Sequence, residues 1–112
     1  MGDQDHWGRD PSVRWMRSVF MAMERHQGRL LKQFAISRWD PRLRLWREQA
    51  LVLFNGAWAG TGRRGIPMDE EKAGRLYAAG LFTILQREGM LPKDFRISFD
   101  ADIEKLLKET GD

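Results

Sequence analysis

Six residues in the middle of the chain have the spacing of a phosphate-binding loop. The run Gly60-Thr-Gly-Arg-Arg-Gly65 matches the glycine pattern of a dinucleotide-binding fingerprint. Such a site needs a strand before the glycines and a helix that begins among them. The residues before this run have helical periodicity instead, and Asp69-Glu70-Glu71 would place three carboxylates where a phosphate would have to bind. We therefore expect residues 60–68 to form an interhelical loop that exposes Arg63 and Arg64, without a cofactor.

The other residues that could support catalysis or bind a metal are few and scattered. The chain has no cysteine, and its two histidines, His6 and His26, lie far apart in the sequence. Glu70 and Glu71 are adjacent, so on a helix they would point about 100° apart and would not converge. We therefore predict no enzyme activity, no catalytic, cofactor-binding or metal-ligating residues, and no small-molecule substrate.

Arginine and tryptophan are concentrated in the first half of the chain. Residues 1–64 contain 12 Lys/Arg and 6 Asp/Glu, whereas residues 65–112 contain 7 and 10. Eleven of those 12 cations are arginine, and all five tryptophans lie in the same half. Arginine binds carboxylate and phosphate in a bidentate manner and stacks on aromatic rings, and both residue types are common in binding hot spots. The predicted macromolecule-binding residues are Arg14, Arg17, Arg25, Arg29, Lys32, Arg38, Arg42, Arg63 and Arg64.

This arginine-rich half supports two hypotheses. In the first, the chain is a non-enzymatic interaction module that docks a partner protein or assembles into a larger complex. In the second, it binds a nucleic-acid backbone as an accessory subunit, because a long helix could align its cations with several phosphates. No zinc finger, RNP motif or basic leucine zipper is present to favour the second hypothesis.

The elements that must position these residues are all predicted to be helices. We expect a small bundle of three main helices over residues 11–36, 41–59 and 69–88, and a short C-terminal helix over 101–109. Asp10-Pro11 and Asp40-Pro41 are start signals, because Asp caps a helix and Pro is favoured in its first turn. Residues 1–9 are expected to be a flexible tail and residues 10–112 one domain. Whether residues 95–99 form a strand is left open.

The apolar residues of each helix predict which face is buried. On the first helix they are Val13, Met16, Val19, Phe20, Met23, Leu30, Leu31 and Phe34, opposite the basic residues. The second helix is apolar over more of its circumference, with Leu43, Trp46, Ala50, Leu53, Phe54, Ala57 and Trp58 on one wide face. We therefore expect the second helix to lie at the centre of the bundle. Its apolar run from 50 to 60 is too short to cross a membrane. With no secretory signal expected, we predict a cytoplasmic protein.

One stretch of the chain resembles a known repeat. Residues 50–80, with Gly60-x-Gly62, Gly65-Ile66-Pro67-x-Asp69-x-x-Lys72-Ala73 and Tyr77, resemble a single Sel1-type helical repeat. The resemblance covers less than a third of the chain, contains one copy, and has Arg63-Arg64 as an insertion. It implies a helical hairpin of the kind that stacks into a protein-interaction solenoid.

Overall fold

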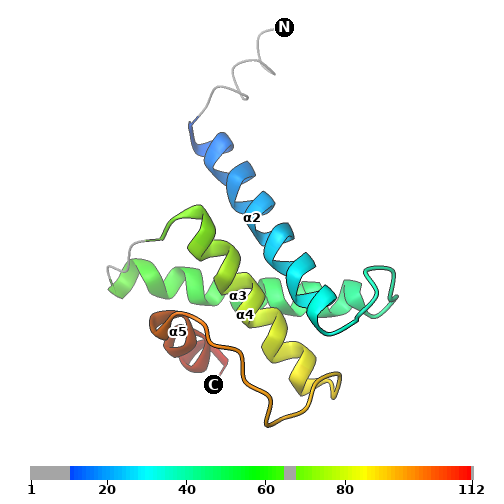
Figure 1. Ribbon diagram of the computed structural model, residues 1–112. Coiled ribbons are helices and arrows are strands. Elements are labelled where there is room, and N and C mark those ends of the chain that lie inside the picture. The colour runs from blue at the N-terminus through cyan, green and yellow to red at the C-terminus, as the bar shows by residue number, and fades with distance from the viewer. Residues whose placement is uncertain (1–10, 65–67, 112) are drawn as a thin grey trace, which may run out of the picture.

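The computed structural model describes residues 11–64 and 68–111 and confirms the all-α prediction. Four helices make up this part of the chain, labelled here as in Figure 1: α2 (Pro11–Gln33), α3 (Leu43–Arg64), α4 (Glu70–Arg87) and α5 (Ala101–Gly111). The connector between α4 and α5 contains no strand, which decides the open question about residues 95–99. The expected tail over residues 1–9 lies outside the described residues.

The helix α4 lies at the centre of the bundle and packs against α2, α3 and α5. Figure 1 shows α2 and α4 side by side, with α3 crossing them and α5 packed near the far end of α3. The expectation that α3 would be central is wrong. Nearly every side chain from Ala73 to Leu85 is buried, because small residues on α4 allow neighbouring helices to approach from several sides.

Both α2 and α4 end in a Schellman motif, in which a residue with positive φ reverses the chain. At the end of α2, Ala35 has φ 54°, and Ile36 N donates to Leu31 O at 2.9 Å. At the end of α4, Gly89 has φ 78°, and Met90 N donates to Leu85 O at 2.9 Å. The motif at Ala35 ends α2 at Gln33, three residues before its predicted end.

The glycine-rich run is part of a helix, so the expectation of a loop beginning at Gly60 is wrong. The helix α3 continues to Arg64, and Thr61 Oγ1 donates to Trp58 O at 2.6 Å. A Cβ at Gly60 would lie 3.2 Å from Leu106 Cδ2 of α5. Packing against α5 therefore outweighs the low helix propensity of glycine. Gly60 and Gly62 of the Sel1-type resemblance therefore lie within α3, whereas its residues Gly65-Ile66-Pro67 lie outside the described residues.

The two helix starts differ in how they use their aspartate. Asp69 is an N-cap, as predicted, and its carboxylate accepts a hydrogen bond from Lys72 N at 2.7 Å. Asp40 instead accepts from Arg42 N at 2.9 Å, and the helix begins only at Leu43. The side chain of Asp100, before α5, is hydrogen-bonded to Arg75 of α4 at 2.9 and 3.1 Å. That carboxylate therefore joins two helices in addition to preceding one.

The core contains most of the predicted apolar faces, with two exceptions on α2. Val19, Met23, Leu30 and Leu31 are buried, as are the side chains Ala73, Leu76, Tyr77, Leu81 and Ile84 of α4. Met16 and Phe20, however, are 51% and 53% exposed, so their assignment to the core is wrong. The physical reason is that the backbones of α2 and α3 do not pack against each other in the described residues, which leaves these side chains at an uncovered seam. The side chain of Val13 lies outside the described residues.

Candidate interaction surfaces

The predicted basic face of α2 is exposed to solvent, and part of it is already paired within the molecule. Its members are Arg14, Arg17, Arg25, Arg29 and Lys32. The Arg25 guanidinium is hydrogen-bonded to the Glu71 carboxylate of α4. The second oxygen of Glu71 lies 2.9 Å from His26 Nε2. One carboxylate therefore ties the basic helix to the start of α4, and the charge of Arg25 is partly compensated.

His26 is the titratable group at this helix contact. Its side chain is only 14% exposed. Burial first, and then the neighbouring charges of Arg29, Arg75 and Arg25, lower the pKa of His26 below its ordinary value of 6.5. Because Glu71 is shared with Arg25, the neutral imidazole with its proton on Nε2 fits this position as a hydrogen-bond donor.

The remaining predicted arginines are in two further places. In the bend between α2 and α3, the Arg38 Cζ lies 4.9 Å from the Trp39 ring centroid. Arg42 binds Asp40 through two nitrogens, at 3.1 and 2.8 Å, and its Cζ lies 5.0 Å from the Trp46 ring centroid. The backbones of Arg63 and Arg64 belong to the last turn of α3, and their side chains lie outside the described residues. The seven predicted residues whose side chains the structure describes are therefore divided between the exposed face of α2 and the bend.

A groove runs along the seam between α2 and α3, and sequence reasoning missed it. It consists of three adjoining hollows of about 290, 170 and 460 Å³ that share Leu51. The first is lined mainly by apolar side chains: Trp15, Met16, Val19, Phe20, Met23, Leu51, Phe54, Asn55 and Trp58. The rings of Trp15 and Trp58 close one end, with centroids 5.3 Å apart. We call this surface the α2–α3 groove.

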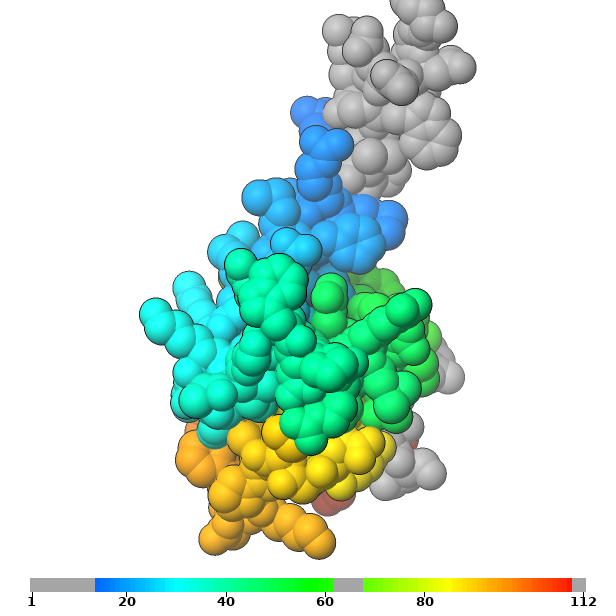
Figure 2. Space-filling view, turned by 90° about the vertical axis from the view of Figure 1, so that its right-hand side faces the viewer, coloured from blue at the N-terminus to red at the C-terminus, as the bar shows by residue number. Residues whose placement is uncertain are grey.

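The other end of the α2–α3 groove is aromatic and charged. Its hollow is lined by the bend around Trp39, which is 78% exposed, and by the first turns of α3. Figure 2 shows this bend in teal at the front of the molecule, between α2 in cyan and blue and α3 in green. Between the two ends lies Tyr77 of α4, whose hydroxyl donates to Gln27. Burial raises the pKa of Tyr77, which keeps this hydroxyl protonated as a donor.

The lining of the groove contains three cations, Arg38, Arg44 and Arg47, and three carboxylates, Glu24, Asp40 and Glu48, and its surroundings add the cations of Arg17 and Arg42. Asp40 is hydrogen-bonded to Arg42, and Glu48 lies 3.7 Å from Arg44. Arg38 and Arg47 also line the groove. Arg17 is a surface neighbour of Phe20, since residues three apart on a helix lie next to each other. Against these cations, Glu24 is the lining carboxylate for which the described residues provide no partner.

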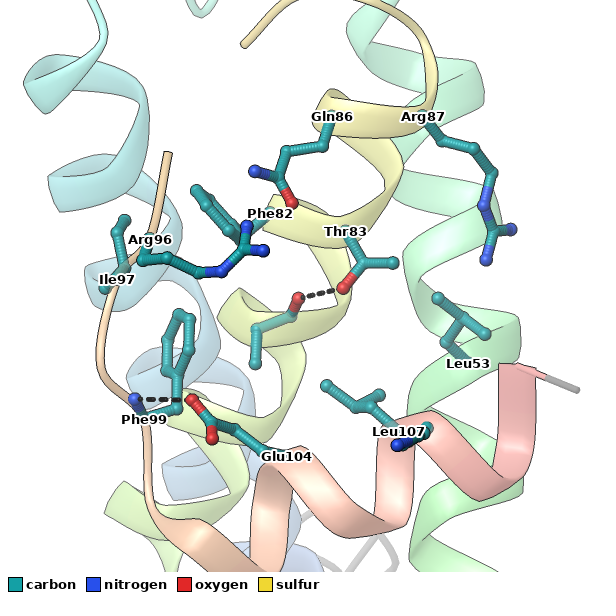
Figure 3. Close-up of a pocket in the computed structure, with 12 residues that line it drawn as sticks. Leu53, Phe82, Thr83, Gln86, Arg87, Arg96, Ile97, Phe99, Glu104 and Leu107 are labelled. Carbon is teal, nitrogen blue, oxygen red and sulfur yellow. Dashed lines mark hydrogen bonds between the residues drawn. The ribbon is translucent and has the colours of Figure 1, made fainter. Parts of the chain in front are cut away.

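A second hollow of about 510 Å³ lies between α4, α5 and the connector, and we call it the α4–α5 cleft. Figure 3 shows its apolar floor, with Leu53, Phe82 and Leu107, and Arg96 reaching from the connector across Phe82. Three cations line it, Arg87, Arg96 and Lys108, together with one carboxylate, Glu104. These residues come from separate segments of the acid-rich half, so no run in the sequence indicated the site.

Two ion pairs hold α5 in position beside this cleft. Arg75 of α4 binds Asp100, and Lys72 of α4 binds Asp102. The guanidinium of Arg75 holds the pKa of Asp100 below its ordinary value of 3.8. The connector is fixed by Gln86, whose amide nitrogen donates to Pro92 O at 3.1 Å and to Phe95 O at 2.8 Å. The walls of the cleft are therefore fixed by polar contacts on two sides.

The part of the chain that the structure describes is a small all-α bundle with two candidate surfaces, the α2–α3 groove and the α4–α5 cleft. Within the described residues, no helix is long and apolar enough to cross a membrane, and no group of three or more acidic or histidine side chains is arranged to hold a metal ion. No known protein family, curated protein or solved structure matches the chain.

Proposed function

We propose that this chain is a non-enzymatic interaction module that docks an acidic, amphipathic helix of a partner protein in the α2–α3 groove. The observation that carries this proposal is the uncovered apolar seam, where Met16 and Phe20 are each about half exposed beside Leu51. Large apolar side chains gathered in a groove are typical of protein-binding sites. A helix that places apolar residues at i, i+3 or i+4, and i+7 fits such a groove.

Charge favours an acidic partner. Arg38 and Arg47 line the groove and Arg17 neighbours Phe20 on α2, whereas two of the three lining carboxylates, Asp40 and Glu48, are already paired within the chain. Complementary charge at the rim of an interface mainly speeds association and selects the partner, whereas the apolar centre provides most of the affinity. The arginines beside the groove, Arg17, Arg38 and Arg47, then serve to select the partner.

The proposal can be tested by peptide display. Helical peptides are selected on the wild-type protein, and their affinity for Phe20→Ser, which removes the ring from the seam, is then measured. We expect the selected peptides to be amphipathic and acidic, and to bind Phe20→Ser at least about tenfold more weakly, a loss of about 1.4 kcal/mol. The matched control is Val52→Ser, because Val52 is 69% exposed but does not line the groove.

Nuclear magnetic resonance (NMR) locates the bound peptide. The indole N–H signals of Trp15 and Trp58 report on the apolar end of the groove, and the signal of Trp39 reports on the bend. Shifts at these signals on peptide addition support the proposal. Equal binding to wild type and Phe20→Ser contradicts it. If instead the protein binds arbitrary oligonucleotides with a steep salt dependence, and Arg17→Gln with Arg29→Gln flattens that dependence, the nucleic-acid alternative replaces it.

A further inference from the structure

We propose that the α4–α5 cleft is a separate site for a small amphiphilic anion, with an apolar body on the cleft floor and a carboxylate beside Arg87 and Lys108. This inference does not depend on the proposed function, because the cleft shares no lining residue with the α2–α3 groove. The volume of about 510 Å³ is in the range of small-molecule sites.

The floor of the cleft suits an apolar body. Phe82 is buried and its ring lies 6.2 Å from that of Phe99, centroid to centroid. Leu53 from α3 and Leu107 from α5 extend this surface across the helices. Unlike Met16 and Phe20, these apolar side chains are at least partly covered by neighbouring elements. A floor of this kind accepts a small apolar group and presents little area to a protein partner.

The charges of the cleft are opposite to those of the half of the chain that builds it. Residues 65–112 contain more acidic than basic residues, yet three cations line the cleft with a single carboxylate. That carboxylate, Glu104, is directed to Phe99 N at 3.4 Å. A site lined by an excess of one charge raises the local concentration of ligands with the opposite charge.

The three cations differ in their contacts within the protein, and this difference indicates where the carboxylate of the ligand binds. Arg96 donates to Lys93 O at 2.9 Å and to Phe95 O at 3.2 Å, so it partly serves the connector. Arg87 and Lys108, by contrast, have no ion pair or hydrogen bond within the described residues and are exposed at the rim. Their donors are available for a carboxylate, and Figure 3 shows Arg87 on the side of α4 that faces Leu53.

The test uses three probes on the full chain: decanoate, decanol and acetate. Decanoate has both the apolar body and the charge, whereas each of the other two lacks one of them. We expect decanoate to shift amide signals of α4, α5 and the connector, and to bind at least tenfold more tightly than either decanol or acetate. Equal affinity for decanoate and decanol, no binding of decanoate, or shifts confined to the α2–α3 groove would overturn the proposal.

A pair of charge-matched variants tests the head-group position. Arg87→Gln with Lys108→Gln should weaken decanoate binding at least tenfold and leave decanol binding unchanged. Arg29→Gln with Lys32→Gln removes the same charge from the exposed face of α2 and should have little effect. An equal loss in both pairs would show general charge attraction and would refute a built site. Phe20→Ser should bind decanoate like the wild type, so failure of the groove proposal and failure of this one can be told apart.

Discussion

The α2–α3 groove and the α4–α5 cleft are both apolar hollows with cationic rims, but they differ in what their side chains already contact. In the groove, Met16 and Phe20 are half exposed, while Arg38, Arg42 and Arg44 stack on tryptophan or pair with carboxylates. In the cleft, the apolar floor is more covered, while Arg87 and Lys108 have no such partner in the described chain.

The difference shows which groups of each surface are left for a ligand to contact: exposed apolar side chains in the groove and unpaired cations in the cleft. Exposed apolar area lowers the free energy when a large partner covers it, by roughly 25 cal/mol per Å² removed from water. An unpaired cation beside a covered apolar floor instead favours a charged small molecule. The groove and the cleft therefore favour different classes of ligand.

A substitution at the contact between α2 and α4 should disturb the groove and leave the cleft intact. A Cβ at Gly74 of α4 would lie 2.9 Å from the Ala22 backbone and 2.6 Å from His26 Cδ2, so α2 and α4 meet closely at this glycine. Gly74→Ala should push α2 away and lower the free energy of unfolding by about 1–3 kcal/mol, measured by urea denaturation. The Trp15 indole signal should shift, and decanoate binding in the cleft should not change.

A second glycine of the bundle provides the matched control. Gly28 lies within α2, and a Cβ added there would meet no heavy atom within 4 Å. Gly28→Ala should raise the free energy of unfolding by about 0.5–1 kcal/mol, because alanine loses less backbone entropy in a helix. If Gly74→Ala stabilises the protein as Gly28→Ala does, the close approach at Gly74 is not as described.

The sequence predicted the helices and most buried faces because periodicity reports directly on which side of a helix is apolar. It did not predict that Met16 and Phe20 remain exposed, since periodicity does not say whether a second helix covers that side. Gly60 was assigned to a loop, and its close packing against Leu106 of α5, a contact distant in sequence, favours the helix instead. The cleft depends on contacts between distant segments, such as Arg75 with Asp100, which a single sequence does not encode locally.

Substitutions at the two turns that border the groove and the cleft should change the free energy of unfolding by smaller amounts. Ala35 precedes the bend beside the groove, and Gly89 begins the connector beside the cleft, and both have positive φ. A side chain disfavours this conformation by roughly 1–2 kcal/mol. Gly89→Ala should therefore lower the free energy of unfolding by about 1 kcal/mol, and Ala35→Gly should raise it by about 0.5 kcal/mol. Thermal and urea unfolding measure both, and a stabilising Gly89→Ala would contradict the turn.

The pH dependence of stability should distinguish the α2–α4 contact from the α4–α5 contact. The folded state holds the pKa of His26 below 6.5, so the unfolded chain binds the proton more tightly there, and stability should fall as the pH decreases below about 6.5. Asp100 has a folded pKa below 3.8, so its contribution persists above about pH 3.8 and is lost as the pH falls through the folded value. His26→Gln should flatten the curve of stability against pH only in the first of these pH ranges, and Asp100→Asn only in the second.

Because His26 contacts α4 from α2, whereas Asp100 joins α5 to α4, hydrogen exchange should show α2 loosening first on acidification and α5 only at lower pH. Simultaneous loosening of both helices would mean that the groove and the cleft belong to one cooperative unit.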